Sequence, residues 1–132
     1  MIKLVMCVTR RPELSREEFQ EYWLNHHGPL VQKFASSYKV IRYVQSHTID
    51  TPLNKAVRDS RGIAQEYDGV AELWWESEAD FVAAIKSEEG QKLRTVFLDD
   101  EAKFLDFSRS AAFFTEEHFL VKEAGRRAAA AD

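Results

Sequence analysis

Apolar and polar positions along the chain follow two different periods, and each period predicts one kind of element. Stretches rich in β-forming residues predict four strands, at 2–9, 40–49, 69–75 and 103–114. Two stretches between them, 15–38 and 77–96, repeat apolar residues at three- and four-residue spacing, which is typical of an amphipathic helix. The predicted order of elements is therefore β-α-β-β-α-β. This order favours an α+β fold with both helices on one face of a four-stranded antiparallel sheet, the ferredoxin-like arrangement.

The first helical stretch has a clear start and a break near its middle. Ser15 is a favourable N-cap, and Glu18 stands three residues later, as in a capping box. Gly28-Pro29 interrupts the pattern, because proline lacks an N–H and its ring meets the carbonyl four residues earlier. We therefore expect a helix that ends near His27 and a second one with Pro29 as its first residue, or at least a kink.

The second helical stretch and the remaining segments complete the domain. Ser77 is the expected N-cap of a helix that reaches roughly Val96, with a possible break at Gly90. Residues 51–67 show no sustained periodicity and predict a long loop, and such loops are often functional. We expect one domain over residues 1–120, followed by a loosely held C-terminal tail over residues 121–132.

Both faces of the predicted sheet carry apolar side chains. Along strand 103–114, Phe107 and Phe113 point one way, whereas Phe104 and Phe114 point the other. A sheet that is apolar on both faces must be covered on both. The helices cover one face, and we expect a second copy of the chain to cover the other. The result is a homodimer, with two sheets packed face to face or closed into a shared barrel.

Composition narrows the class of protein. The chain has 132 residues, 45% of them hydrophobic and 30% charged, which is typical of one soluble globular domain. The formal net charge of -4 leaves no basic stripe for nucleic acid. No apolar run approaches the length of a membrane span, and the first residues lack the features of a signal peptide. A single cysteine fits a reducing compartment, so we expect a cytoplasmic protein without a membrane partner.

Aromatic residues and two histidines are the candidates for a small-molecule site. Helices held off a sheet by aromatic rings leave a cleft that suits a small ligand, and the rings expected to line it are Tyr22, Trp23, Tyr43, Trp74 and Phe97. The alternative is that these rings only fill the core. His27 at the helix break and His47 near the end of the second strand are candidates for a general acid or base. The alternatives are an imidazole that caps helix carbonyls and a strand-edge imidazole in water.

Other polar residues point less clearly to chemistry. Asp106 interrupts the apolar fourth strand, where it is either a carboxylate inside the cleft or an edge residue in a salt bridge. Asp99-Asp100-Glu101 lacks the alternation of a calcium loop and is expected to begin a turn. There is no His-x-x-x-His motif, cysteine pair or glycine-rich phosphate loop. We therefore expect neither a metal site nor an organic cofactor.

The sequence resembles the EthD-domain family, named from ethyl tert-butyl ether degradation, within the dimeric α+β barrel superfamily. The resemblance covers nearly all of the chain except the tail and parts of the 51–67 loop. It rests on segments that follow one another in the family's order: Leu14 to Phe19 leading to Trp23, His27-Gly28-Pro29-Leu30, Tyr43 to His47, Asp68 to Trp74, and the end pattern from Asp106 to His118.

The resemblance implies a homodimeric ferredoxin-like fold with a pocket between helices and sheet. His27 and His47 match the family's recurrent histidines, and Trp23 and Tyr43 match its pocket-lining aromatics. Similar fungal members are associated with dehydration or decarboxylation of polyketide intermediates. Related barrels include lactone isomerases, cofactor-free monooxygenases, polyketide cyclases and haem-handling proteins.

We expect a small cofactor-free enzyme of the dehydratase, isomerase or lyase type that acts on a cyclic, polyketide-like or aromatic metabolite. His27 is its expected general base or acid, with His47 as partner or oxyanion stabiliser. One alternative is a non-catalytic protein that binds a hydrophobic metabolite or assists an oxidative degradation pathway. The others are a cofactor-free monooxygenase and a haem binder.

Overall fold

The computed structural model describes residues 1–121 and 123, so most of the expected C-terminal tail lies outside the described residues. The strands are β1 (Ile2–Val8), β2 (Arg42–His47), β3 (Gly69–Trp75) and β4 (Ala111–Thr115). The helical segments are α1 (Arg16–Tyr22), η1 (Trp23–His27), α2 (Gly28–Phe34), α3 (Pro52–Asp59), α4 (Glu78–Lys86), α5 (Glu88–Glu101) and η2 (Phe107–Arg109).

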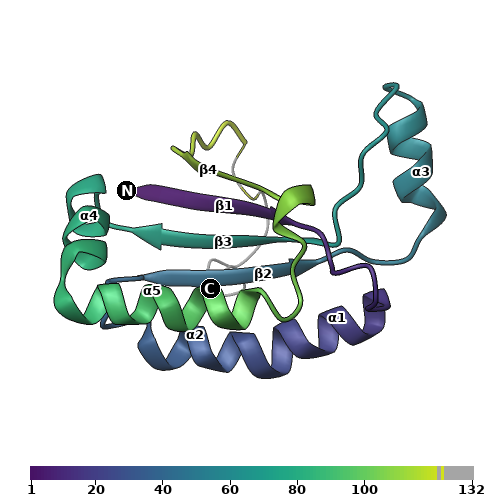
Figure 1. Ribbon diagram of the computed structural model, residues 1–132. Helices are drawn as coiled ribbons and strands as arrows, with labels where there is room; N and C mark the ends of the chain where they lie inside the picture. The colour runs from purple at the N-terminus through teal and green to yellow at the C-terminus, as the bar shows by residue number, and fades with distance from the viewer. Residues whose placement is uncertain (122, 124–132) are drawn as a thin grey trace.

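The four strands form one antiparallel sheet in the order β2-β3-β1-β4. The helices α1, α2 and α5 run along one face of this sheet, and α3 stands beyond one of its ends (Figure 1). This arrangement confirms the expected α+β class and the four-stranded antiparallel sheet. No helix in the described ranges has both the length and the apolar composition needed to cross a bilayer.

The first helical stretch starts as expected but continues through the Gly28-Pro29 pair. The side chain of Ser15 accepts from the backbone N–H of Glu18, and the Glu18 carboxylate accepts from the N–H of Ser15, which is a complete capping box. Between α1 and α2 the turn is π-helical, and the N–H of Gly28 donates to the carbonyl of Trp23. A new α-helical segment does begin at this break, at Gly28 with Pro29 in its first turn, one residue before the expected start, and the π-helical turn joins it to α1. The wider turn lets the chain keep helical backbone angles past a residue that has no N–H to donate.

Three other expected elements differ from the structure. Ser77 caps α4 as predicted, but the break falls at Ser87 instead of Gly90, and α5 continues to Glu101. The expected strand over 103–114 is wrong in its first half, which forms turns and the short η2, and the paired strand begins only at Ala111. The expected 51–67 loop contains α3, whose cap Thr51 precedes a proline at a position where a missing N–H costs nothing.

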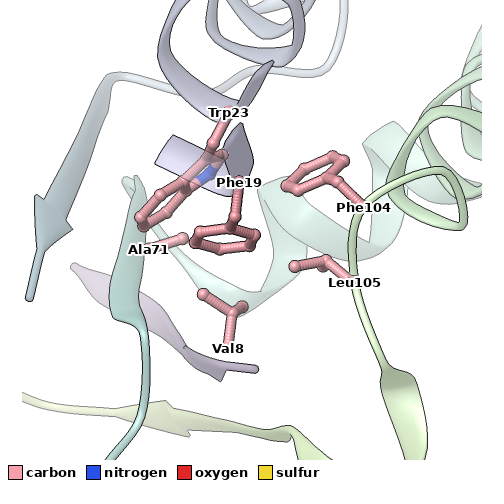
Figure 2. Close-up of a cluster of buried hydrophobic side chains, with 6 residues drawn as sticks. All are labelled: Val8, Phe19, Trp23, Ala71, Phe104 and Leu105. Carbon is pink, nitrogen blue, oxygen red and sulfur yellow. The ribbon is translucent and has the colours of Figure 1, made fainter. Parts of the chain in front are cut away.

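The core beneath the sheet is built where α1 and the segment after α5 meet β1 and β3. Six buried residues form it, as Figure 2 shows: Val8, Phe19, Trp23, Ala71, Phe104 and Leu105. The ring of Phe19 lies 5.4 Å from that of Trp23 and 5.6 Å from that of Phe104, at tilted angles that aromatic pairs favour. This cluster fixes α1 and η1 against the sheet, and it therefore fixes the position of the residues that follow in η1.

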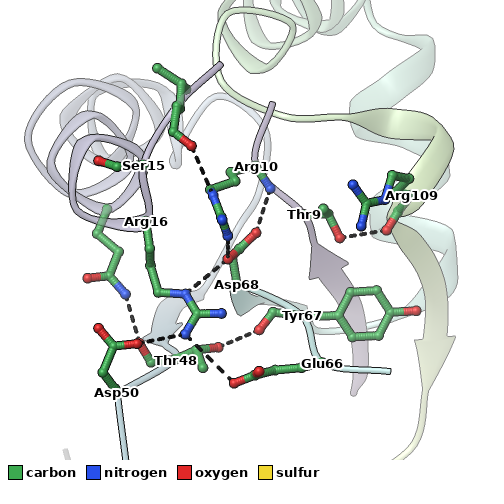
Figure 3. A network of polar contacts seen from close by, with 12 residues as sticks. Thr9, Arg10, Ser15, Arg16, Thr48, Asp50, Glu66, Tyr67, Asp68 and Arg109 are labelled. Atoms are coloured by element: carbon green, nitrogen blue, oxygen red, sulfur yellow. Dashed lines mark hydrogen bonds and ion pairs between the residues drawn. The ribbon is translucent and has the colours of Figure 1, made fainter. Parts of the chain in front are cut away.

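A buried carboxylate ties the end of β1 to α1 and β3. The Asp68 side chain, only 4% exposed, accepts from the backbone N–H and the guanidinium of Arg10 and from Nε of Arg16 (Figure 3). Arg16 also reaches the exposed carboxylate of Asp50 at 3.0 Å. Burial by itself raises the pKa of Asp68, but these hydrogen bonds and charges outweigh it and hold that pKa below its usual value.

The opposite face of the sheet has no helix packed over it within the described residues (Figure 1). Trp74 lies on this face, with the Lys3 ammonium 5.3 Å and the Arg42 guanidinium 4.7 Å from its ring centre. Its indole N–H donates to the carboxylate of Glu117 at 2.6 Å. Lys3, Arg42 and Glu117 thus form a charged row around Trp74 on this face. The same face also has apolar side chains, among them Phe113, which is 50% exposed.

Candidate functional site

A cavity of about 240 Å³ lies between the helices and the covered face of the sheet. Its wall is mostly apolar: the strands contribute Leu4, Met6, Ala71, Leu73 and Trp75, and the helices contribute Trp23, Val31, Phe97 and Leu98. The ionisable groups on the wall are His27, Tyr38, Tyr43, Arg94 and Glu101. A small apolar enclosure with a few polar groups is the usual form of a site for a small organic molecule.

His27 is held on the cavity wall by a carboxylate that sequence reasoning did not identify as functional. Its Nδ1 lies 2.7 Å from Oδ2 of Asp100, and the other oxygen of Asp100 accepts from the Tyr22 hydroxyl at 2.6 Å. Burial raises the pKa of Asp100, but the hydrogen bonds from Tyr22 and His27 more than offset it, so that pKa lies below its usual value. Asp100 is therefore ionised at neutral pH, and the shared hydrogen belongs to Nδ1.

The state of the His27 imidazole follows from these contacts. Burial lowers its pKa, and the hydrogen bond and charge of Asp100 oppose that effect without cancelling it. At neutral pH the ring is uncharged, Nδ1–H donates to Asp100, and Nε2 carries the lone pair. No buried side-chain nitrogen or oxygen in the described residues lacks a hydrogen-bond partner, so Nε2 keeps access to open space. An imidazole oriented by a carboxylate through Nδ1 is arranged as a general base at Nε2.

His47 does not share this wall. Its ring stacks on Trp23 at 4.5 Å between centres, and its Nε2 donates to Oε1 of Gln45 at 2.8 Å. The amide nitrogen of Gln45 in turn donates to the Trp23 carbonyl and to the Tyr43 hydroxyl. Burial lowers the pKa of His47. The structure thus places His47 behind the wall, where it orients Gln45 and the two aromatic residues.

The other residues expected at the site divide into two groups. Trp23, Tyr43 and Phe97 line the cavity. Tyr22 reaches the site only through its hydroxyl on Asp100, and Trp74 lies on the opposite face of the sheet. Asp106 precedes η2 and accepts from the Ser108 hydroxyl at 2.6 Å, outside the cavity.

Sequence reasoning missed the polar groups that α5 places on the cavity wall, Arg94 and Glu101, because it ended the second helix too early. Arg94, Phe97, Leu98 and Glu101 recur at three- and four-residue spacing and share one face of α5. The pattern is visible in the sequence once the helix is extended beyond Val96. The expectation that residues 99–101 begin a turn is wrong, since they form the last turn of α5.

Glu101 is the most perturbed acid on the cavity wall. Burial, with a further contribution from the negative charge of Asp100, raises the pKa of its carboxyl to about 7. Tyr43, also buried, has its pKa raised to about 12 and stays protonated. Within the described ranges, no three histidine, cysteine, aspartate or glutamate side chains gather in a way that could hold a metal ion.

Comparisons with known proteins agree with the fold. The sequence profile of the EthD domain matches residues 11–108. Among solved structures, an ethyl tert-butyl ether degradation family protein from Bacillus halodurans is 19% identical, with a TM-score of 0.60 over 89% of this chain and 99% of that one. No curated protein matches the chain significantly.

Two further structures share the fold at lower identity. A dimeric protein of unknown function with a ferredoxin-like fold, from Bacteroides fragilis, is 8% identical, with a TM-score of 0.57 over 88% of this chain and 95% of that one. SnoaB, a cofactor-independent oxygenase from Streptomyces nogalater, is 14% identical, with a TM-score of 0.53 over 92% of this chain and 97% of that one. At these identities the likeness concerns the fold alone.

Proposed function

The chain belongs to the EthD family, and from that premise we propose that it is a small enzyme that performs acid–base catalysis on a cyclic or aromatic metabolite without a cofactor. The observation that carries the proposal is the His27 imidazole on the wall of an apolar cavity, with Nδ1 fixed on Asp100. Such a base serves those of the expected dehydratase, isomerase and lyase reactions that begin with the removal of a proton from an activated carbon.

The proposed step is proton abstraction at Nε2 of His27. The imidazolium that forms is stabilised by the ionised Asp100, which accepts from Nδ1 throughout, while the Tyr22 hydroxyl holds the second carboxylate oxygen. The rings of Trp23, Tyr43 and Phe97 favour a flat substrate against the wall. General base catalysis of this kind accelerates a reaction by about 10²–10⁴-fold, which suits a substrate already activated by a carbonyl group.

Hydrogen–deuterium exchange of α-tetralone, a bicyclic ketone with an activated carbon, tests the proposal. In deuterated buffer the protein should accelerate loss of the α-proton signal, and His27→Ala should reduce this acceleration about 10²-fold or more. His26→Ala is the matched control, because the neighbouring imidazole is exposed and does not line the cavity. Equal exchange by wild type and His27→Ala, or none by the wild type, would contradict the proposal.

A second candidate reaction is cofactor-independent oxygenation, which the likeness to SnoaB favours. The same base would generate the carbanion of an enol or phenol, and molecular oxygen would then add to it. An oxygen electrode separates the two reactions with the substrate that co-purifies with the protein: oxygenation consumes one molecule of oxygen per turnover, and the proton-transfer reactions consume none.

We propose in addition that a second copy of the chain covers the open face of the sheet. The supporting observations are the exposed apolar side chains on that face and the dimeric nature of the Bacteroides fragilis neighbour. An apolar sheet face is stable in water only when it is covered, and a closed twofold assembly covers both copies at once.

A further inference from the structure

A carboxyl group lies on the cavity wall beside the His27–Asp100 pair. Glu101 follows Asp100 directly and lines the same cavity as His27, and its carboxyl accepts no hydrogen bond from any described residue. It is the last residue of α5, where the negative end of the helix dipole disfavours an additional negative charge. Its position therefore favours the protonated, neutral carboxyl for reasons of geometry alone.

The charged and titratable groups around this carboxyl strengthen that preference. From α5 they are the Asp100 carboxylate and the exposed Arg94, and from the other elements they are His27, Tyr38 and Tyr43. Asp100 and the two tyrosines offer no positive charge, and His27 is neutral at neutral pH. Arg94 is the cation on the cavity wall, and Lys103, two residues after Glu101, lies 3.8 Å from Oδ1 of Asp100; neither cation forms an ion pair with Glu101 within 4 Å. Together with burial, these neighbours place the pKa of Glu101 at about 7.

We propose that Glu101 is the catalytic acid that acts together with His27, and that its protonated carboxyl donates to the carbonyl oxygen of a neutral, enolisable ring ketone. In the step, Nε2 of His27 takes the α-proton, the electron pair of that C–H bond forms the enol double bond, and Glu101 gives its proton to the oxygen. The products are the enol, an imidazolium and a carboxylate, so protons and charge balance without another reactant. This inference rests on the proposed function of His27.

The dimensions and polarity of the cavity agree with this substrate class. An apolar cavity of roughly 150 Å³ accommodates one benzene ring. The present cavity, at about 240 Å³, offers space for a ring system slightly larger, such as two fused rings with a carbonyl group. A carboxylate substrate would have to place its charge in an apolar enclosure beside Asp100, which is unfavourable.

Two substitutions at position 101 separate binding from proton transfer. Glu101→Gln keeps a hydrogen-bond donor but has no acidic proton to transfer. Glu101→Met keeps a side chain of similar length but removes both the donor and the acidic proton. Glu101→Gln should bind α-tetralone like the wild type, measured by tryptophan fluorescence, and should lose about 10²-fold in deuterium exchange. Glu101→Met should also lose the preference for α-tetralone over tetralin, which lacks the carbonyl. The control is Glu88→Gln on the same helix, whose side chain is 91% exposed.

The pH dependence supplies a result that a purely structural role of Glu101 would not give. Wild-type preference for α-tetralone over tetralin should disappear as pH rises through about 7, while Glu101→Gln should keep it on both sides of that pH. The inference would be overturned if the wild-type preference for α-tetralone over tetralin did not depend on pH, or if Glu101→Met kept that preference. Loss of exchange in His27→Ala together with full exchange in Glu101→Gln would overturn it while leaving the proposed function intact.

Discussion

At the scale of single residues, the site is organised by Asp100. Its two oxygens accept from Tyr22 and His27, and its charge adds to the burial that raises the pKa of the neighbouring Glu101. In the proposed reaction, one carboxylate thus supports the base and helps to keep the acid protonated. The pKa values of the adjacent carboxyls Asp100 and Glu101 are shifted in opposite directions, and carboxyl pairs with such different environments are typical of acid–base sites.

Replacement of this carboxylate should change both pKa values in the same direction. Asp100→Asn removes the negative charge that favours the imidazolium of His27, so the pKa of His27 should fall further. The same change removes the like charge that disfavours the Glu101 anion, so the pKa of Glu101 should fall as well. NMR titration of the His27 ring and the Glu101 carboxyl measures both. Tyr22→Phe retains the charge and should shift the two values less; an upward shift of either in Asp100→Asn would contradict this account.

Asp68 gives a matched prediction about stability. Asp68→Asn leaves two arginines facing a buried, uncharged amide and should lower the free energy of unfolding by about 3 kcal/mol, measured in urea. Asp50→Asn removes a carboxylate that also contacts Arg16 but is 88% exposed, and it should cost less than about 1 kcal/mol. Equal costs would show that burial of the Asp68 network contributes nothing.

The same carboxylate predicts a response to acid. Because the pKa of Asp68 is lowered in the folded state, its stabilisation is complete above the unfolded pKa of about 3.9 and is lost as pH falls through the folded value. The wild type should therefore lose stability more steeply than Asp68→Asn in this acidic range. Unfolding curves taken at several pH values test this, and parallel losses in the two proteins would contradict it.

At the scale of elements, the sequence predicts where a helix begins better than where it ends. Ser15 and Ser77 act as caps because a side-chain oxygen next to free N–H groups is a local signal. β3 matches its predicted bounds, since its apolar run is flanked by polar residues on both sides. The π-helical turn depends on packing against the sheet and on Phe104, which no local pattern reports. Asp100 and Glu101 were missed for a different reason: the helix was ended near Val96, although its three- and four-residue spacing continues from Arg94 to Glu101.

The corner between α4 and α5 depends on a glycine. A Cβ added at Gly90 would lie 1.8 Å from the carbonyl oxygen of Ala84, a backbone atom that cannot rotate away. Gly90→Ala should therefore cost more than about 3 kcal/mol in the free energy of unfolding, beyond most overpacked substitutions. Gln91→Ala, at the next and exposed position of the same helix, should change it by less than about 0.5 kcal/mol. A similar small cost for both would mean that the corner opens easily.

At the scale of the whole molecule, one face of the sheet holds the cavity, and the other has no helix packed over it among the described residues. The charged row around Trp74 sets a register that a second copy would have to match, and the apolar positions around Phe113 supply area to bury. The sequence indicates the apolar positions through alternation. It does not indicate which charged side chains gather over Trp74, because Lys3, Arg42 and Glu117 come from three separate segments.

The proposed association can be tested with two matched substitutions. Phe113→Asp places a charge on the open face at edge strand β4 and should convert the protein from dimer to monomer in analytical ultracentrifugation, with the circular dichroism spectrum unchanged. Leu53→Asp alters an apolar side chain of α3 that is 70% exposed but lies off the sheet, and it should leave the dimer intact. A monomeric wild type at micromolar concentration would contradict the proposed dimer.

The π-helical turn between α1 and α2 has a consequence for chain length. It contains one residue more than an α-helical turn would need, so every residue after it is rotated by about 100° from the continuation of α1. Deletion of Asn25 alone should let α1 continue into α2 with ordinary helical spacing and leave His27 near its present phase, while Phe19 and Trp23 keep their places in the core. If the same residues instead formed a regular α-helix with none deleted, His26 would take the phase that His27 now occupies. The extra residue in the π-helical turn therefore decides which of two adjacent histidines faces the cavity.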